Sequence, residues 1–324
     1  MNDSRMMNLL KILLGYLLYW TGILSILMRR FVKSGLYVLS YHSFNTFTND
    51  YFRFGSLFIS NYRDNFELQI KFFNRHFSKA NPQVLSQESI GERAYLLTFD
   101  DGYKDNYSIA FPLLQKYKAP SIFFITTGYI GQNSFLWHDR VRYHYERQYL
   151  NGERAVKSKR ACKKDLKRLK SMEQSSFQKA LAAYDADFQD SIRLMMDWQE
   201  VKQCQQGGIT IAPHSHEHMI LSRLSSKEKS SDVEKSLAAL KEKLDHPEII
   251  HFCLPEGTKE SMDSETLDLL AGNGIKILFL TEPGVNTRIQ KEKGIILMKR
   301  IGLNPSDPVP VVMLKIILAS MRQR

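Results

Sequence analysis

The stretch YLLTFDDG (residues 95–102) decides the fold. Its first five residues are apolar or β-forming and predict a short buried strand. Two adjacent carboxylates, Asp100 and Asp101, follow the strand directly, and Gly102 comes next. In an α/β barrel, residues that directly follow the strands lie at the active face. The plainer alternative is an Asp-Gly turn with a carboxylate that caps a helix.

Apolar strand patterns and helical patterns alternate on both sides of this stretch. That alternation predicts an α/β fold with a parallel sheet and helical crossovers. The pattern predicts strands at 36–41, 95–99, 121–126, 210–212, 249–253, 275–280 and 295–297, and helices at 61–77, 106–116, 226–244 and 263–272.

The composition narrows the class of protein. With 43% hydrophobic and 24% charged residues among 324, the chain has enough apolar residues for a core and is not disordered as a whole. A net charge of +11 suits an anionic membrane surface, an acidic glycolipid or a nucleic acid. No RNA-binding aromatic signature or zinc-finger spacing occurs, so a nucleic-acid partner is not expected. The widely spaced Cys162, Cys204 and Cys253 predict buried, reduced thiols.

The amino terminus predicts a membrane attachment. Residues 9–28 carry a single charge, Lys11, and are long enough to cross a bilayer, and no cleavage pattern follows them. We therefore assign residues 1–34 to a single N-terminal anchor in the bacterial cytoplasmic (inner) membrane. The flanking charges lean weakly towards a cytoplasmic catalytic domain. A helix lying in the membrane plane is the alternative.

Residues 35–308 form the expected barrel domain, with a helical insertion at about 140–196. The centre of this insertion, residues 154–170, carries nine basic residues and a single acidic one, Asp165. A solvated basic helix is the ordinary interpretation, and binding of an anionic lipid or glycan is the sharper one. The tail, 309–324, is amphipathic and predicts either a second membrane-surface helix or a packed terminal helix.

A histidine cluster follows the strand at 210–212. His214, His216 and His218 fall within five residues, and neutral imidazole is the commonest metal ligand. His214 and His218 are four apart, so one helical turn would place both rings on one face, with His216 pointing elsewhere. Together with one carboxylate they would form a two-histidine, one-acid metal site with positions left for water and substrate.

These motifs in order resemble those of the polysaccharide deacetylases with nodulation-type (NodB) homology, a family related to the family-four carbohydrate esterases. The resemblance rests on TFDDGY (98–103), on HSHEH (214–218) and on the Pro-Glu-Gly turn at 255–257. It spans roughly residues 36–303. It implies a distorted (β/α) barrel of seven or eight strands and a divalent metal, most often Zn²⁺, although Co²⁺, Ni²⁺ or Mn²⁺ would suit the same ligands.

The resemblance also implies residue roles. Asp100 would be the general base, and Asp101, His214 and His218 would hold the metal. The backbone N–H of Glu256 would donate to the oxyanion. Three further residues would contact the substrate: Tyr103, Trp137 and Pro255. Stacking on a sugar ring is one interpretation of Trp137, and a place in the core is the other.

Two departures from the family pattern concern the acid and the oxyanion. Glu256 stands where an aromatic residue is usual, and its carboxylate would oppose an oxyanion unless it points away. No histidine follows Arg300, although many members supply a late histidine as general acid. His42, which ends the first strand, is our candidate for that role, with His138 and His251 behind it. Arg300 is a candidate for orienting Asp100, and a surface arginine is the ordinary alternative.

The function that follows is hydrolysis of a carbon–nitrogen bond outside peptides. The chain would remove N-acetyl groups from an amino sugar, in a bacterial glycan of the cell envelope or in a lipid-linked glycan. The alternative is a membrane-bound protein of the same fold that has lost catalysis and binds glycans or acts as a scaffold.

Overall fold

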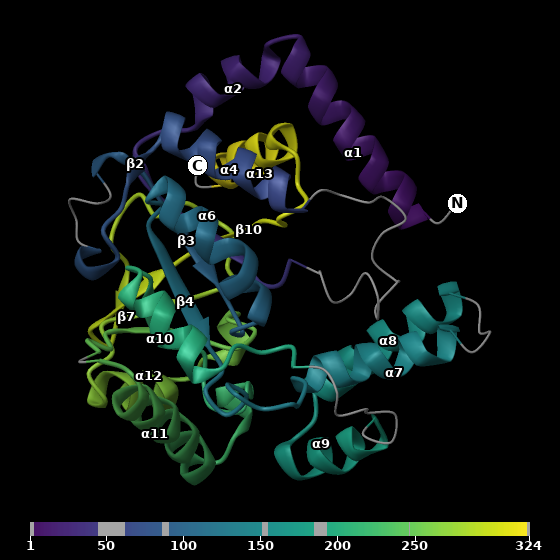
Figure 1. Cartoon of the computed structure of the whole chain (residues 1–324), viewed down its shortest axis with the longest axis vertical. Coiled ribbons are helices and arrows are strands. Elements are labelled where there is room, and N and C mark those ends of the chain that lie inside the picture. The colour runs from purple at the N-terminus through teal and green to yellow at the C-terminus, as the bar shows by residue number, and fades with distance from the viewer. Residues whose placement is uncertain are drawn as a thin grey trace.

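The computed structural model describes residues 3–44, 62–85, 91–150, 155–184, 193–245 and 247–322. Its strands, parallel except for β8, form two neighbouring sheets that curve into a nearly closed barrel (Figure 1). One sheet has the order β10-β1-β3-β4-β5, with β2 beside β3, and the other has the order β6-β7-β9-β8. The strands are β1 (Gly35–Tyr41), β2 (Ser78–Lys79), β3 (Arg93–Phe99), β4 (Ser121–Ile125), β5 (Thr210–Pro213), β6 (His251–Cys253), β7 (Ile277–Phe279), β8 (Lys291–Glu292), β9 (Ile295–Met298) and β10 (Ile301–Gly302). The predicted α/β barrel is confirmed.

The register of the strands determines which side chains meet at the carboxyl edge. β1 pairs with β3 from Gly35↔Arg93 to Tyr41↔Phe99, so the residues that follow, His42 and Asp100, lie side by side. β4 pairs with β5 up to Ile125↔Pro213, and the His214 N–H donates to the Ile125 carbonyl at 2.8 Å. The Asp-Asp and histidine motifs therefore reach the same end of the barrel.

Helices cover the outside of the barrel through amphipathic faces. The predicted helix at 61–77 is α4 (Tyr62–His76), which buries Phe66, Ile70 and Phe73 at helical spacing. The helix predicted at 106–116 begins as a π-helical turn, 106–110, before α6 (Phe111–Tyr117). The remaining covering helices are α10 (Trp198–Gln206), α11 (Ser226–Lys243), α12 (Ser264–Gly272) and α13 (Val309–Met321).

The described residues of the insertion include three α-helices that project beside the barrel (Figure 1). They are α7 (Trp137–Leu150), α8 (Ala155–Lys170) and α9 (Gln174–Leu181). The expected solvated helix, α8, is only partly solvated. It buries Cys162 and Leu169 in a cluster with Trp137, Val141 and Phe177. Its basic residues therefore occupy one side of a packed helix.

The expected single N-terminal helix is instead two helices. α1 (Asp3–Trp20) and α2 (Ile23–Phe31) meet at a 90° bend, so the prediction of one continuous segment was wrong. Gly22 has φ +75°, a left-handed conformation that breaks the helix and that glycine adopts without strain. Among the described residues, no single helix has the length and hydropathy to cross a bilayer; Ile12–Trp20 and Ile23–Phe31 meet that criterion only as a bent pair.

Candidate metal and active site

The two adjacent carboxylates point in different directions. Asp100 and Asp101 are each 1% exposed, and Asp101 has φ +76°, which turns the chain sharply at the strand end. Gly102, at φ +90°, could not be replaced easily, because a Cβ there would lie 3.0 Å from Ile130 and 3.2 Å from Ile125. Asp101 therefore faces the histidines, while Asp100 faces Arg300.

His214 and His218 approach the same carboxylate oxygen. Their Nε2 atoms lie 3.5 Å and 3.0 Å from Asp101 Oδ1, and their ring centroids are 4.9 Å apart. The helical turn predicted between them is wrong, because Ser215 and His218 have φ values of +64° and +56°. A loop with left-handed residues brings the rings together instead, and such strained positions cluster at functional sites.

That loop is held by hydrogen bonds that the sequence analysis did not predict. Asp232, on α11, accepts hydrogen bonds from the backbone N–H groups of His216 and Glu217 at 3.0 Å and 2.9 Å. The Ser215 hydroxyl accepts from the His218 N–H at 2.8 Å. The indole of Trp137 donates to the His218 carbonyl at 3.2 Å. The loop conformation thus depends on contacts distant in sequence.

The donor set fits a divalent metal ion. Asp101, His214 and His218 each offer one ligand atom, and these atoms all lie within 4.8 Å of one another. Asp101 Oδ1 is buried and accepts no well-aligned hydrogen bond from any described residue, as expected of an atom that serves a cation. Two imidazoles and one carboxylate are a common set for zinc and similar ions.

The protonation states of His214 and Asp101 suit metal binding. His214 Nδ1 lies 2.8 Å from the Cys253 carbonyl oxygen, an arrangement that leaves Nε2 free to face Asp101. Burial lowers the pKa of His214 to about 4, so its ring is neutral near pH 7. Burial alone would raise the pKa of Asp101, but the neighbouring His218 outweighs it and holds that pKa well below its usual value. Asp101 is therefore ionised.

Asp100 is paired with a buried arginine. Arg300 donates from both terminal nitrogens to the two Asp100 oxygens, at 2.7 Å and 2.8 Å, and from Nε to the Leu280 carbonyl at 2.8 Å. Arg300 is 1% exposed, which excludes the alternative of a surface arginine. Burial opposes ionisation of Asp100, but the charges of Arg300, His214 and His42 lower its pKa. Asp100 is thus a fixed, ionised carboxylate.

The three candidate acids occupy different environments. His42 lies beside Asp100, with Nε2 3.7 Å from Asp100 Oδ2, and its side chain is 56% exposed. His138 is buried, with Nδ1 3.2 Å from Asp139 and its ring packed edge-on to His218. His251 is buried in β6 against Phe279. His42 therefore combines closeness to Asp100 with access from solvent.

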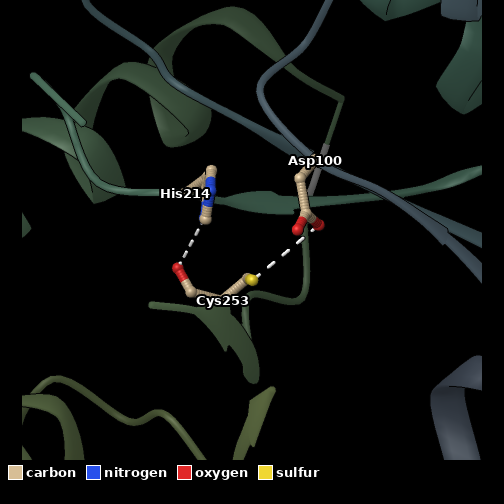
Figure 2. A group of neighbouring side chains, drawn as sticks. All are labelled: Asp100, His214 and Cys253. Atoms are coloured by element: carbon tan, nitrogen blue, oxygen red, sulfur yellow. Dashed lines mark hydrogen bonds between the residues drawn. The ribbon is translucent and has the colours of Figure 1, made fainter. Parts of the chain in front are cut away.

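Cys253 is a further member of the site that was predicted only to be a buried thiol. Figure 2 shows His214 turned towards the Cys253 carbonyl and the Cys253 sulfur turned towards Asp100. The sulfur lies 3.8 Å from Asp100 Oδ1. Burial raises the pKa of this thiol well above its usual value, so Cys253 is a neutral neighbour of Asp100.

The Glu256 carboxylate pairs with a basic residue of the insertion. Glu256 has φ +63°, and no described residue accepts a hydrogen bond from its backbone N–H. Its side chain pairs with Lys170, at the end of α8, with Nζ 2.7 Å from each carboxylate oxygen. Lys170 of the basic insertion thus neutralises Glu256, a contact that the sequence did not predict.

The expected substrate-contacting residues are largely covered. Tyr103 is 7% exposed and its hydroxyl donates to Asp139 at 2.7 Å. Trp137 is 3% exposed and packs edge-on against Phe177, which favours the core interpretation over sugar stacking. Pro255 is buried beside Glu256.

Known proteins resemble this chain in sequence and in fold. A Staphylococcus aureus (strain N315) poly-beta-1,6-N-acetyl-D-glucosamine N-deacetylase is 32% identical over 118 residues, which is 33% of this chain; the chain spans about two fifths (41%) of that relative. Two solved structures have the same fold. A Streptococcus pyogenes deacetylase in complex with acetate has a TM-score of 0.57 at 17% identity and covers 88% of this chain and 99% of its own. IcaB from Ammonifex degensii has a TM-score of 0.54 at 18% identity and covers 89% and 97%.

Residues 87–278, more than half of the chain, match the family model described as polysaccharide deacetylase. That range contains the buried carboxylate pair, both histidines that face Asp101, and Glu256. The chain belongs to the polysaccharide deacetylase family.

Proposed function

We propose that this chain is a metal-dependent hydrolase that removes N-acetyl groups from an amino sugar. The observation that carries the proposal is the convergence of Asp101, His214 and His218 on one point, with the separate carboxylate of Asp100 beside them. A divalent ion bound by the first three residues would lower the pKa of a water molecule and polarise the acetamide carbonyl.

The chain's own residues would manage the protons. Asp100 would accept the proton of the attacking water. Its carboxylate is ionised, and the two hydrogen bonds from Arg300 fix its orientation. His42 would supply a proton to the leaving amine, because it is exposed to solvent and lies next to Asp100. The Glu256 N–H would donate to the oxygen on which negative charge develops.

The proposed substrate is an N-acetylated glycan or a lipid-linked amino sugar at the bacterial cytoplasmic membrane. Two features support that location: the apolar segment 9–28 and the net charge of +11. The named activity of the Staphylococcus aureus relative supports an N-acetylglucosamine polymer as the sugar. Reporter fusions on both sides of residues 9–28 would choose between the classes. An outward catalytic domain would favour a polymer, and an inward one a lipid-linked precursor.

The test is metal content measured together with acetate release. Purified wild type and Asp101→Ala would be compared on N-acetylated oligosaccharides and on an N-acetylated glycolipid. We expect about one metal ion per chain and acetate release in the wild type, and loss of both in the variant, because Asp101 is the anionic ligand. Circular dichroism would show that the variant is folded. Wild type that binds no metal after reconstitution would contradict the proposal and leave a glycan-binding protein.

Two further variants would separate proton transfer from metal binding. Asp100→Asn and His42→Gln should keep the metal and lower turnover by about 10²–10⁴-fold, the usual range for a lost general base or acid. His144→Gln, at a histidine of α7, is the matched control and should keep turnover. Unchanged turnover in His42→Gln would remove His42 as the acid.

A further inference from the structure

The described part of the chain carries a pronounced apolar surface outside the site. Ten large hydrophobic side chains are exposed among the described residues, and nine of them come from α1, α2 and α13. These nine define what we call the helical face: Leu13, Leu14, Leu17, Tyr19, Trp20, Ile23, Ile26, Leu318 and Met321. Scattered apolar residues are normal on a protein surface, whereas such a concentration indicates a partner.

The helical face is fixed to the barrel. α1 and α2 arch over α13 (Figure 1), and both helices contact it. α2 buries Leu24 and Met28, and α13 buries Val312, Ile316 and Ile317 in the same core cluster. Straightening α1 and α2 into one span would break the packing of at least one of them against α13. The bend of 90° is therefore held by packing.

The charge around the helical face is mostly positive: Asp3 is the one acidic residue within α1, α2 and α13, and Lys315 pairs with Asp307. From Ser4 to Phe44 and from Val309 to Arg324 the sequence contains no aspartate or glutamate. The same two segments contain eight basic residues: Arg5, Lys11, Arg29, Arg30, Lys33, Lys315, Arg322 and Arg324. Arg29, Arg30 and Lys33 are exposed directly beside the apolar residues of α2. A second copy of this chain would bring like charges together, whereas an anionic lipid surface would complement them.

We propose that α1, α2 and the exposed end of α13 lie in the plane of an anionic bilayer and attach the barrel to one leaflet without crossing it. Helices that lie at the interface insert apolar side chains just below the lipid headgroups, while basic residues contact those headgroups. Trp20, 79% exposed, and Tyr19 are side chains that favour this depth. The inference rests on the membrane location proposed above and specifies how the chain is held there.

In-plane attachment makes a topological prediction. The amino terminus and the catalytic barrel stay on the same side of the membrane, whereas a spanning helix places them on opposite sides. In membrane vesicles from expressing cells, an amino-terminal tag and the barrel should be both cut, or both protected, by added protease. A protected tag on a vesicle whose barrel is digested would overturn the proposal in favour of a span.

Vesicle binding by the purified full chain tests the surface itself. Vesicles of phosphatidylcholine would be compared with vesicles that also contain phosphatidylglycerol, using co-sedimentation. We expect binding only to the anionic vesicles, weakened about tenfold or more in Arg29→Gln/Arg30→Gln. Lys163→Gln/Lys164→Gln, an equal loss of charge from exposed positions on α8, is the matched control and should bind as the wild type does. Equal weakening by the two pairs would overturn the assignment.

The apolar contribution has its own readout. Leu17→Glu/Ile26→Glu should abolish binding, since both side chains are exposed and neither supports the core. Bromine-labelled lipids should quench the fluorescence of the wild type, and Trp20→Phe should retain binding while losing most of the quenching. A chain that dimerises through these residues and binds no vesicles would overturn the proposal. Acetate release measured in the same samples keeps failure of attachment distinct from failure of the deacetylase.

Discussion

The carboxyl end of the barrel and the helical face depart from the usual distribution of residues in opposite ways. At the site, charged groups are buried: Asp100, Asp101 and Arg300 are each 1% exposed. On the helical face, apolar side chains are exposed, and Trp20 reaches 79%. Buried charge is tolerated only with partners, and exposed apolar surface persists only with a use. Asp100 and Arg300 are partners of each other, whereas Asp101 and the exposed apolar side chains support the cation and the bilayer proposed above.

Replacing one arginine in each region tests this contrast between buried and exposed groups most directly. Arg300→Met would leave the Asp100 carboxylate buried without its partner, which typically costs about 3–5 kcal/mol. Arg29→Met, at an exposed position on α2, should leave the free energy of unfolding unchanged. Urea denaturation of both variants measures the difference. Equal stabilities would mean that Asp100 finds another partner or becomes protonated at little cost.

A smaller effect is expected at Asp139, a buried carboxylate next to His138. Burial alone would raise the pKa of Asp139, but His138, Arg142 and the Tyr103 hydroxyl outweigh it and lower that pKa to about 2. Because the folded pKa lies below the unfolded value, Asp139 stabilises the fold above about pH 4. This contribution is lost as the pH falls towards 2.

Asp139→Asn should therefore lower the free energy of unfolding near pH 7 by about 2 kcal/mol, and the difference from wild type should shrink between pH 4 and pH 2. Chemical denaturation at a series of pH values measures it. Asp268→Asn, which removes an exposed pair with Lys293, is the control and should show no such trend. A difference that persists at pH 2 would assign the effect to packing.

The smallest predicted effect links the insertion to the site. Without Lys170, the Glu256 carboxylate would oppose negative charge that develops near its own backbone N–H, so Lys170→Met should lower turnover about tenfold. The double variant Lys170→Met/Glu256→Gln removes both charges and should recover most of the activity. Lys167→Met, at an exposed position on α8, should change little. A double variant as slow as the single one would show that Lys170 acts through packing.

Much of the fold followed from the sequence because its strands are short, apolar and separated by clear helical patterns. The strand predicted at 36–41 begins one residue earlier in the structure, and that at 121–126 ends one residue earlier. The proposed metal ligands could be grouped because each follows a strand, and the carboxyl ends of parallel strands meet. Their roles in binding metal remain predictions.

The features that escaped prediction depend on backbone conformation and on distant partners. The HSHEH motif does not predict the left-handed conformations of Ser215 and His218, because it contains no glycine, the residue that usually indicates that conformation. The pairing of Lys170 with Glu256 joins residues 86 apart. The hydropathy of residues 9–28 does not predict the bend at Gly22, because a hydropathy pattern records apolar residues and not helix breaks.

The Asp100–Arg300 pair also sets an order of events during synthesis. The two residues are 200 apart, and Arg300 directly precedes β10, the strand that pairs with β1. During translation, Asp101, His214 and His218 therefore leave the ribosome well before Arg300, the partner of Asp100. A nascent chain could gather those three side chains early, but Asp100 is held only once the last strand docks. An incomplete chain that lacks Arg300 therefore lacks the residue that fixes Asp100, the proposed base.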